Sequence, residues 1–121
     1  MYKRSKIEIK KSIYFLILML IIILLYKFFK IKILSYMLVH SKELVILPFV
    51  NFTLVFNSGV AFGIFRDFGQ LVPHIFSFIG VVFGLGLISW AIFNKKHYLA
   101  MTLISAGALG NAIDRIRLGV V

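Results

Sequence analysis

The sequence predicts an all-α integral membrane protein that forms a single membrane domain, residues 1–121. Of its 121 residues, 61% are hydrophobic and only 15% are charged, and the mean hydropathy is +1.01. A soluble domain has about 45–50% apolar and about 25% charged residues. Long apolar segments also alternate with short basic stretches. A chain of this length and composition leaves little room for a separate water-soluble domain.

The basic residues flank the apolar segments, although the formal net charge of +10 could also suggest nucleic acid. Anionic lipid headgroups attract such flanking lysines by about 1 kcal/mol each. The chain has no cysteine, which excludes disulfides, a thiol nucleophile and thiolate metal ligands. The histidines have no ligand-like spacing. We expect membrane lipid as a partner, and neither nucleic acid, a metal nor a cofactor.

The first transmembrane helix is expected over residues 12–29. Ile13–Leu25 is an unbroken apolar run, and a basic leader precedes it. Tyr26 and Lys27 extend the run if their side chains reach the interface. No small-residue cleavage site follows, so we interpret it as an uncleaved helix rather than a secretory signal peptide.

Residues 30–70 are expected to be the one non-helical region. Apolar and polar side chains alternate over Val50–Asn57, which predicts a half-buried strand. Ser58 and Gly59 end it, and Ala61–Phe65 is a short apolar stretch suited to the membrane interface.

Two further spans are expected over residues 71–93 and 98–114, joined by a short loop at 94–97. Gly80 and Gly84 form a G-x-x-x-G pair in the second span, and small residues line the third. Such faces let another helix approach closely.

The basic leader, residues 1–11, predicts a cytoplasmic N-terminus. The 94–97 loop is then also inside, and the 30–70 segment is extracytoplasmic. Seven basic residues fall on each side in this topology, so only the density of the leader decides it.

Three polar residues end the third span. Asn111, Asp114 and Arg115 have spacings of three and four, so on a helix Asn111 faces both of the others. Ionisable residues at membrane depth are costly and suggest a functional site. The alternative is that Asp114 pairs with Arg115 or Arg117 to end the helix at the headgroups. The spacing leaves both open.

Two blocks resemble the lipoprotein signal peptidase (signal peptidase II) family, which are membrane aspartic peptidases that act on lipid-modified prolipoproteins. Phe56–Phe65 is similar to the family's N-x-G-x-A-F block. Gly107–Arg115, followed by Gly119–Val121, is similar to its G-x-x-G-N-x-x-D-R-x-x-x-G-x-V-x-D-F block. The resemblance covers the chain from the first helix to its last residue.

The resemblance implies a four-helix fold in a bacterial inner membrane, of which this chain would have three helices, plus a β segment and an interfacial helix outside. It implies that Asn57, Gly59, Asn111 and Arg115 bind substrate and that Asp114 supports the site. The substrate would be a lipid-modified prolipoprotein. The signal helix would pack on small-residue surfaces such as those at Gly80, Gly84, Ala106 and Gly110. The full-length protein would be a monomer.

Two departures from the family pattern accompany the resemblance. Residues 115–121 begin the catalytic segment, and both catalytic aspartates are expected beyond Val121, so we expect the 121 residues alone to be inactive. Tyr26 stands where the family has the Asp of D-Q-x-x-K, and we expect that loss to affect substrate binding or site integrity. The alternative is a non-catalytic small polytopic protein, such as a transporter subunit or assembly factor.

Overall fold

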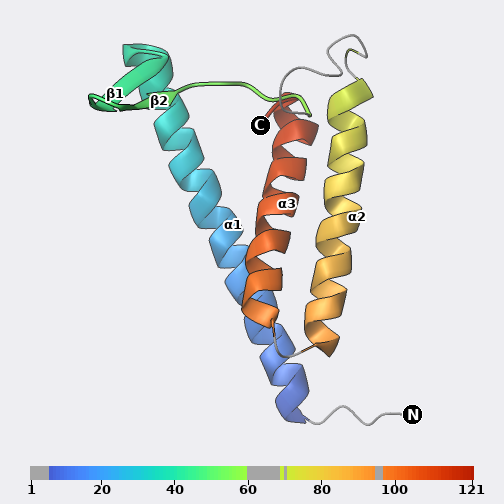
Figure 1. Ribbon diagram of the computed structural model, residues 1–121. Helices are drawn as coiled ribbons and strands as arrows, with labels where there is room; N and C mark the ends of the chain where they lie inside the picture. Colours follow the sequence, from blue (N-terminus) through green and yellow to red (C-terminus); the bar gives the residue numbers. More distant parts are fainter. Residues whose placement is uncertain (1–5, 60–68, 70, 95–96) are drawn as a thin grey trace.

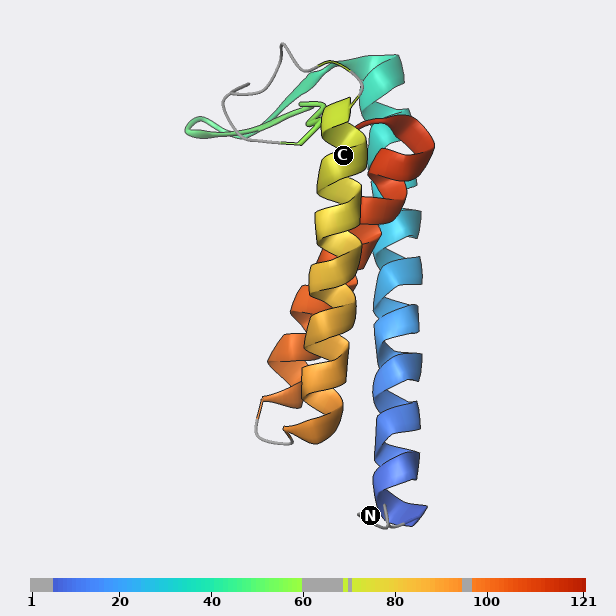
Figure 2. The same ribbon diagram turned by 90° about the vertical axis from the view of Figure 1, so that its right-hand side faces the viewer.

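The computed structural model describes residues 6–59, 69, 71–94 and 97–121. Three long helices and one β-hairpin make up this part of the chain, and α3 lies between α1 and α2 in Figure 1. The hairpin, the end of α3 and the start of α2 share one end of the molecule, and the start of α1 lies at the other (Figures 1 and 2). The elements are α1 (Lys6–His40), β1 (Glu43–Leu47), β2 (Val50–Thr53), α2 (Leu71–Phe93) and α3 (Tyr98–Leu118).

Helix α1 is longer than the predicted span of residues 12–29. It has 35 residues, about 50 Å at 1.5 Å per residue, which exceeds the bilayer hydrocarbon thickness of about 30 Å. The helix does not end at Phe29 as expected, because residues 30–40 contain neither glycine nor proline and are rich in helix-forming leucine, lysine and methionine. The helix therefore continues through the lysines near position 30 and does not end there.

Helix α2 begins and ends where the sequence predicts, at Leu71 and Phe93. Helix α3 begins at Tyr98 as predicted and continues past residue 114 to Leu118. Among the residues that the structure describes, two helices are long and apolar enough to cross a membrane, Ile9–His40 and Leu71–Phe93. The small and charged residues of α3 lower its mean hydropathy. Hydropathy therefore identifies α1 and α2 as spans but does not identify α3, the third expected span.

Glycines bring α2 and α3 into close contact. A Cβ at Gly80 would lie 3.2 Å from the Ala108 carbonyl oxygen, and a Cβ at Gly84 would lie 2.8 Å from Leu109 Cγ. The Ser105 hydroxyl, which is fully buried, donates a hydrogen bond to the Gly84 carbonyl oxygen at 3.1 Å. The helix that packs on the G-x-x-x-G pair is therefore α3 of the same chain.

The expected packing of the signal helix on these small-residue surfaces is wrong, because other parts of the chain already cover them. Helix α3 occupies the surface at Gly80 and Gly84, and the Tyr26 ring lies 3.2 Å from where a Gly110 Cβ would be. Ala106 is buried as well. The chain's own helices cover these small residues, which sequence alone could not distinguish from a docking face.

Helices α1 and α3 run in the same direction and meet near both ends. The rings of Phe15 and Tyr98 have centroids 4.2 Å apart. Far along both helices, Lys27 and Lys30 contact Asp114. These contacts fix the register between α1 and α3 at which the site residues meet.

The β-hairpin is antiparallel, with Glu43 opposite Thr53 and Leu44 opposite Phe52. Strand β2 is the first half of the predicted strand Val50–Asn57, while β1 was not predicted because its contiguous apolar residues show no alternation. The expected half-burial is wrong, since every residue of β2 is exposed. The hairpin projects away from the helices (Figure 2), and nearly all of its strand residues are exposed.

The predicted interfacial stretch, Ala61–Phe65, lies outside the described residues.

Candidate functional site

The two family-like blocks meet at one end of the molecule. The Asn57 amide donates to the Val121 carbonyl oxygen at 2.9 Å, and the Val121 amide donates to the Asn57 carbonyl oxygen at 2.8 Å. Gly119, at φ 75°, ends α3 in the left-handed conformation that favours glycine. This turn directs the chain toward the segment after β2, so the Asn57 turn and the Arg115 end of α3 share one site.

Asn57 and Gly59 build the turn that enters this site. The Gly59 amide donates to Asn57 Oδ1 at 2.8 Å, as asparagine side chains commonly accept in turns. A Cβ at Gly59 would lie 2.6 Å from both Phe76 Cδ2 and Val72 Cγ1, so α2 leaves room only for glycine there. Turn formation and packing account for both residues locally, and their contact with substrate stays a prediction.

Asp114 is held by two lysines of α1. Its Oδ2 lies 2.6 Å from Lys30 Nζ, its Oδ1 contacts Lys27 Nζ, and its side chain is only 7% exposed. Lys27 also donates to the Gly110 carbonyl oxygen at 3.0 Å. The alternative pairing of Asp114 with Arg115 or Arg117 is therefore wrong. The carboxylate joins α1 to α3, because a buried charge requires a partner.

Tyr26 belongs to the same cluster. Its hydroxyl donates to Asn111 Oδ1 at 3.0 Å and accepts from Lys30 Nζ at 3.0 Å. Its ring fills the space that the missing Gly110 side chain leaves. Tyr26 thus forms hydrogen bonds at the position where the family pattern has a carboxylate.

The partners of Asp114 could have been predicted by comparing how far each charged residue lies from the start of its expected span. Lys27 lies 15 residues after Ser12, and Asp114 lies 16 residues after Tyr98. Charges at equal depth on neighbouring spans tend to pair. Spacing within the one helix points instead to Arg115 and Arg117, which are not the partners of Asp114.

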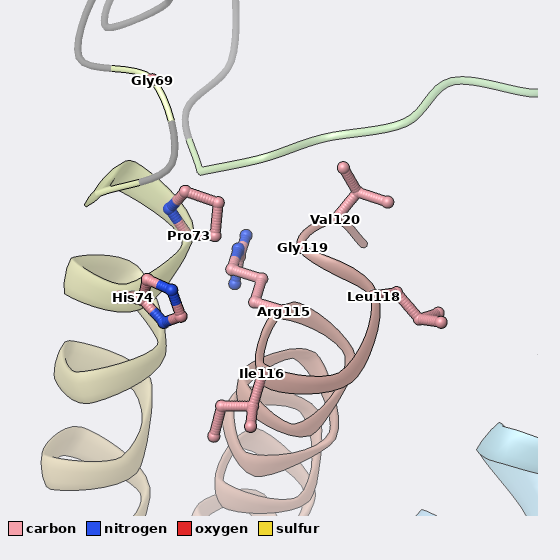
Figure 3. A pocket seen from close by; sticks show the side chains of 8 residues that line it. All are labelled: Gly69, Pro73, His74, Arg115, Ile116, Leu118, Gly119 and Val120. Carbon is pink, nitrogen blue, oxygen red and sulfur yellow. The ribbon is translucent and has the colours of Figure 1, made fainter.

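The first cavity lies between the start of α2 and the end of α3 and has a volume of about 440 Å³ (Figure 3). The Arg115 side chain points toward Pro73 (Figure 3). Arg115 Nε is buried and, within the described part of the chain, has no hydrogen-bond partner. Because the Arg115 side chain lines the cavity, its guanidinium group can supply donors to a ligand acceptor. The lining residues are Gly69, Pro73, His74, Arg115, Ile116, Leu118, Gly119 and Val120.

The second cavity, of about 450 Å³, lies on the opposite side of the α3 end, against α1. Its lining is almost entirely apolar, with Lys30 and the Tyr26 side chain at its polar edge. Such a surface suits an acyl chain whose polar group lies near the lysine. The lining residues are Tyr26, Phe29, Lys30, Ile33, Leu34, Leu54, Val55, Phe56, Leu118, Val120 and Val121.

The two apolar helices, the interhelical ion pairs and the two cavities define a helical membrane protein with a polar site at one end. The family model described as signal peptidase (SPase) II matches residues 16–121. The chain therefore belongs to the signal peptidase II family, whose members are bacterial membrane proteins.

Curated relatives agree with this family. A lipoprotein signal peptidase of Shewanella sediminis is 42% identical over 80 residues, 63% of this chain and 46% of the relative. Those of Hydrogenovibrio crunogenus and Acinetobacter baylyi are each 35% identical, over 69% and 68% of this chain and 51% and 48% of the relatives. The chain thus spans about half the length of the curated relatives it matches. No solved structure gives a significant match.

Proposed function

We propose that the chain functions as a lipoprotein signal peptidase, an aspartic endopeptidase that removes signal peptides from diacylglyceryl-modified prolipoproteins. Family membership and the names of the relatives support this function. The observation that carries it for this chain is the backbone pairing of Asn57 with Val121, which joins the two family blocks between a polar and an apolar cavity.

The two cavities suit the two halves of a lipidated peptide. The apolar cavity beside Lys30 would take acyl chains, whose burial contributes about 0.8 kcal/mol per methylene. The cavity beside Arg115 would take peptide carbonyl groups, because the Arg115 side chain lines it and its guanidinium carries N–H donors. Asn57, Gly59 and Asn111 complete the proposed substrate site, and Asp114 supports it.

The proposed reaction requires a pair of catalytic carboxylates, and Asp114 is not one of them. A pair of aspartates that share one proton supplies a base for water and an acid for the carbonyl oxygen. Asp114 is unsuited to either role, because lysine ammonium groups contact both of its carboxylate oxygens. We therefore assign Asp114 to the structure of the proposed site and not to catalysis.

The proposed location is the bacterial cytoplasmic membrane, with a cytoplasmic N-terminus and the site on the extracytoplasmic side. Helix α3 would be the third span despite its low hydropathy, because α1 satisfies its charged carboxylate and α2 covers its small residues. A fourth helix and a monomeric full-length protein complete this proposal.

Binding of a synthetic diacylglyceryl-cysteine peptide to the chain in lipid nanodiscs tests the proposal. We expect binding of the lipidated peptide and much weaker binding of the same peptide without lipid. Arg115→Gln should weaken binding by about tenfold, as for a lost charged hydrogen bond. Arg117→Gln is the matched control, because Arg117 is exposed on the same turn. Equal binding of lipidated and unlipidated peptide, or equal effects of the two variants, would contradict the proposed site.

A further inference from the structure

Hydrogen bonds run in one direction from Lys30 through Tyr26 to Asn111. A lysine ammonium group can only donate, so the Tyr26 oxygen must accept from Lys30 Nζ, 3.0 Å away. The hydroxyl proton of Tyr26 then points elsewhere, and its partner is Asn111 Oδ1 at 3.0 Å. Lys30 is itself fixed by Asp114 at 2.6 Å. The donor-to-acceptor order from Lys30 to Tyr26 to Asn111 therefore follows from the fact that an ammonium group cannot accept.

This direction fixes the orientation of the Asn111 amide. Its oxygen faces α1 because only an acceptor can meet the Tyr26 proton. Its Nδ2 group, which carries two donor hydrogens, has no acceptor among the described residues. The Asn111 side chain is half-buried, so a ligand at the site can reach that group.

We propose that Tyr26 is a positioning residue that makes Asn111 present a hydrogen-bond donor, rather than an acceptor, to the ligand. The identity of that ligand rests on the proposed function: the donor would bind a backbone carbonyl of the lipidated peptide. Residue 26 would thereby select which polar atom of a peptide bond Asn111 recognises.

The surroundings of Tyr26 hold its hydroxyl in place. The ring packs on Gly110, where a Cβ would lie 3.2 Å from Tyr26 Cε1. Lys27 donates to the Gly110 carbonyl oxygen and Lys30 Nζ lies 5.3 Å from the ring centroid. A side chain at residue 110 would displace the ring, so the glycine and the tyrosine act together.

A carboxylate at position 26 would have the opposite effect. An ionised aspartate only accepts hydrogen bonds, so it would draw the Asn111 Nδ2 group toward α1 and turn Oδ1 outward. Tyr26→Asp should therefore reverse the amide, while Tyr26→Phe should release it. Tyr36→Phe is the matched control, since it removes a tyrosine hydroxyl from an exposed position of the same helix.

The test is solution or solid-state NMR of the 121-residue chain in nanodiscs with ¹⁵N-labelled asparagine. The chain has four asparagines, and an Asn111→Asp variant assigns the signal of interest. We expect Tyr26→Asp to slow solvent exchange of the Asn111 Nδ2 protons by roughly tenfold, because a carboxylate acceptor protects them. Tyr26→Phe and Tyr36→Phe should leave that exchange fast. Circular dichroism of each variant checks that the helices remain.

Unchanged Asn111 exchange in folded Tyr26→Asp, or slow exchange in the wild type, would overturn the proposal. The same samples then receive the diacylglyceryl-cysteine peptide. Binding should slow exchange of the Asn111 donors in the wild type and be several-fold weaker in Tyr26→Phe. A wild type that binds no lipopeptide would refute the proposed function, while the amide orientation in the free protein would still test the role of Tyr26.

Discussion

Helix α3 packs against its two neighbours in different ways. Toward α2 it meets glycines and buried hydroxyls, with Ser105 donating to the Gly84 carbonyl oxygen and Ser77 donating to that of Ala112. Toward α1, near its end, it meets long charged and aromatic side chains. The first interface depends on shape and the second on charge. Only the charged interface adjoins the apolar cavity proposed for lipid.

The largest expected effect is at the charged interface. Asp114→Asn would leave Lys27 and Lys30 without a counter-charge and should lower the free energy of unfolding by about 3 kcal/mol. Unfolding of the chain in mixed micelles, followed by circular dichroism, measures this. Glu43→Gln, which changes an exposed carboxylate bonded to Asn51, should have little effect.

A rescue variant sharpens this result. Replacing Lys27, Lys30 and Asp114 together by methionine, methionine and leucine should recover most of the loss, because an apolar set needs no charge balance. If the triple variant is no more stable than Asp114→Asn, the lysines do not cause the loss.

A smaller effect is expected at the shape-dependent interface. Gly84→Leu places side-chain atoms where Leu109 already lies and should cost about 1–3 kcal/mol through overpacking. Gly86→Leu on the same helix is the control, because a Cβ there has no heavy atom within 4 Å. Equal loss of stability in both variants would mean that helix propensity, and not the α2–α3 contact, is responsible.

The smallest expected effect comes from one buried hydroxyl. Ser105→Ala removes the interhelical bond to Gly84 and should cost about 0.6 kcal/mol, as is typical of such bonds in membranes. Ser89→Ala removes a bond to Leu85 within α2 and should be closer to neutral. A loss above that of Gly84→Leu would reverse the order proposed for the two kinds of contact.

The sequence predicted those features that depend on local pattern. The limits of α2 follow from an apolar run that begins near Pro73 and ends before charged residues. The two family blocks also identified the residues that meet at one end of the molecule. In both cases the residues that allow the prediction lie close together in the sequence.

Features that depend on a second segment were missed. Asp114 pairs with lysines more than 80 residues away, and Tyr26, interpreted from the family pattern as a loss, takes part in a hydrogen-bond network. Strand β1 was missed because strand pairing, and not alternation, defines it. Periodicity and spacing describe one segment at a time, so they cannot choose between partners.

The pairing of Asn57 with Val121 also has a consequence for the order of assembly. These residues are 64 positions apart, and only two backbone hydrogen bonds join them. Closing so long a loop costs chain entropy, which is recovered only after α2 and α3 have packed together. We expect the site to form after the helices have assembled and to open before they separate, so that ligand binding would slow the opening of the whole helix end.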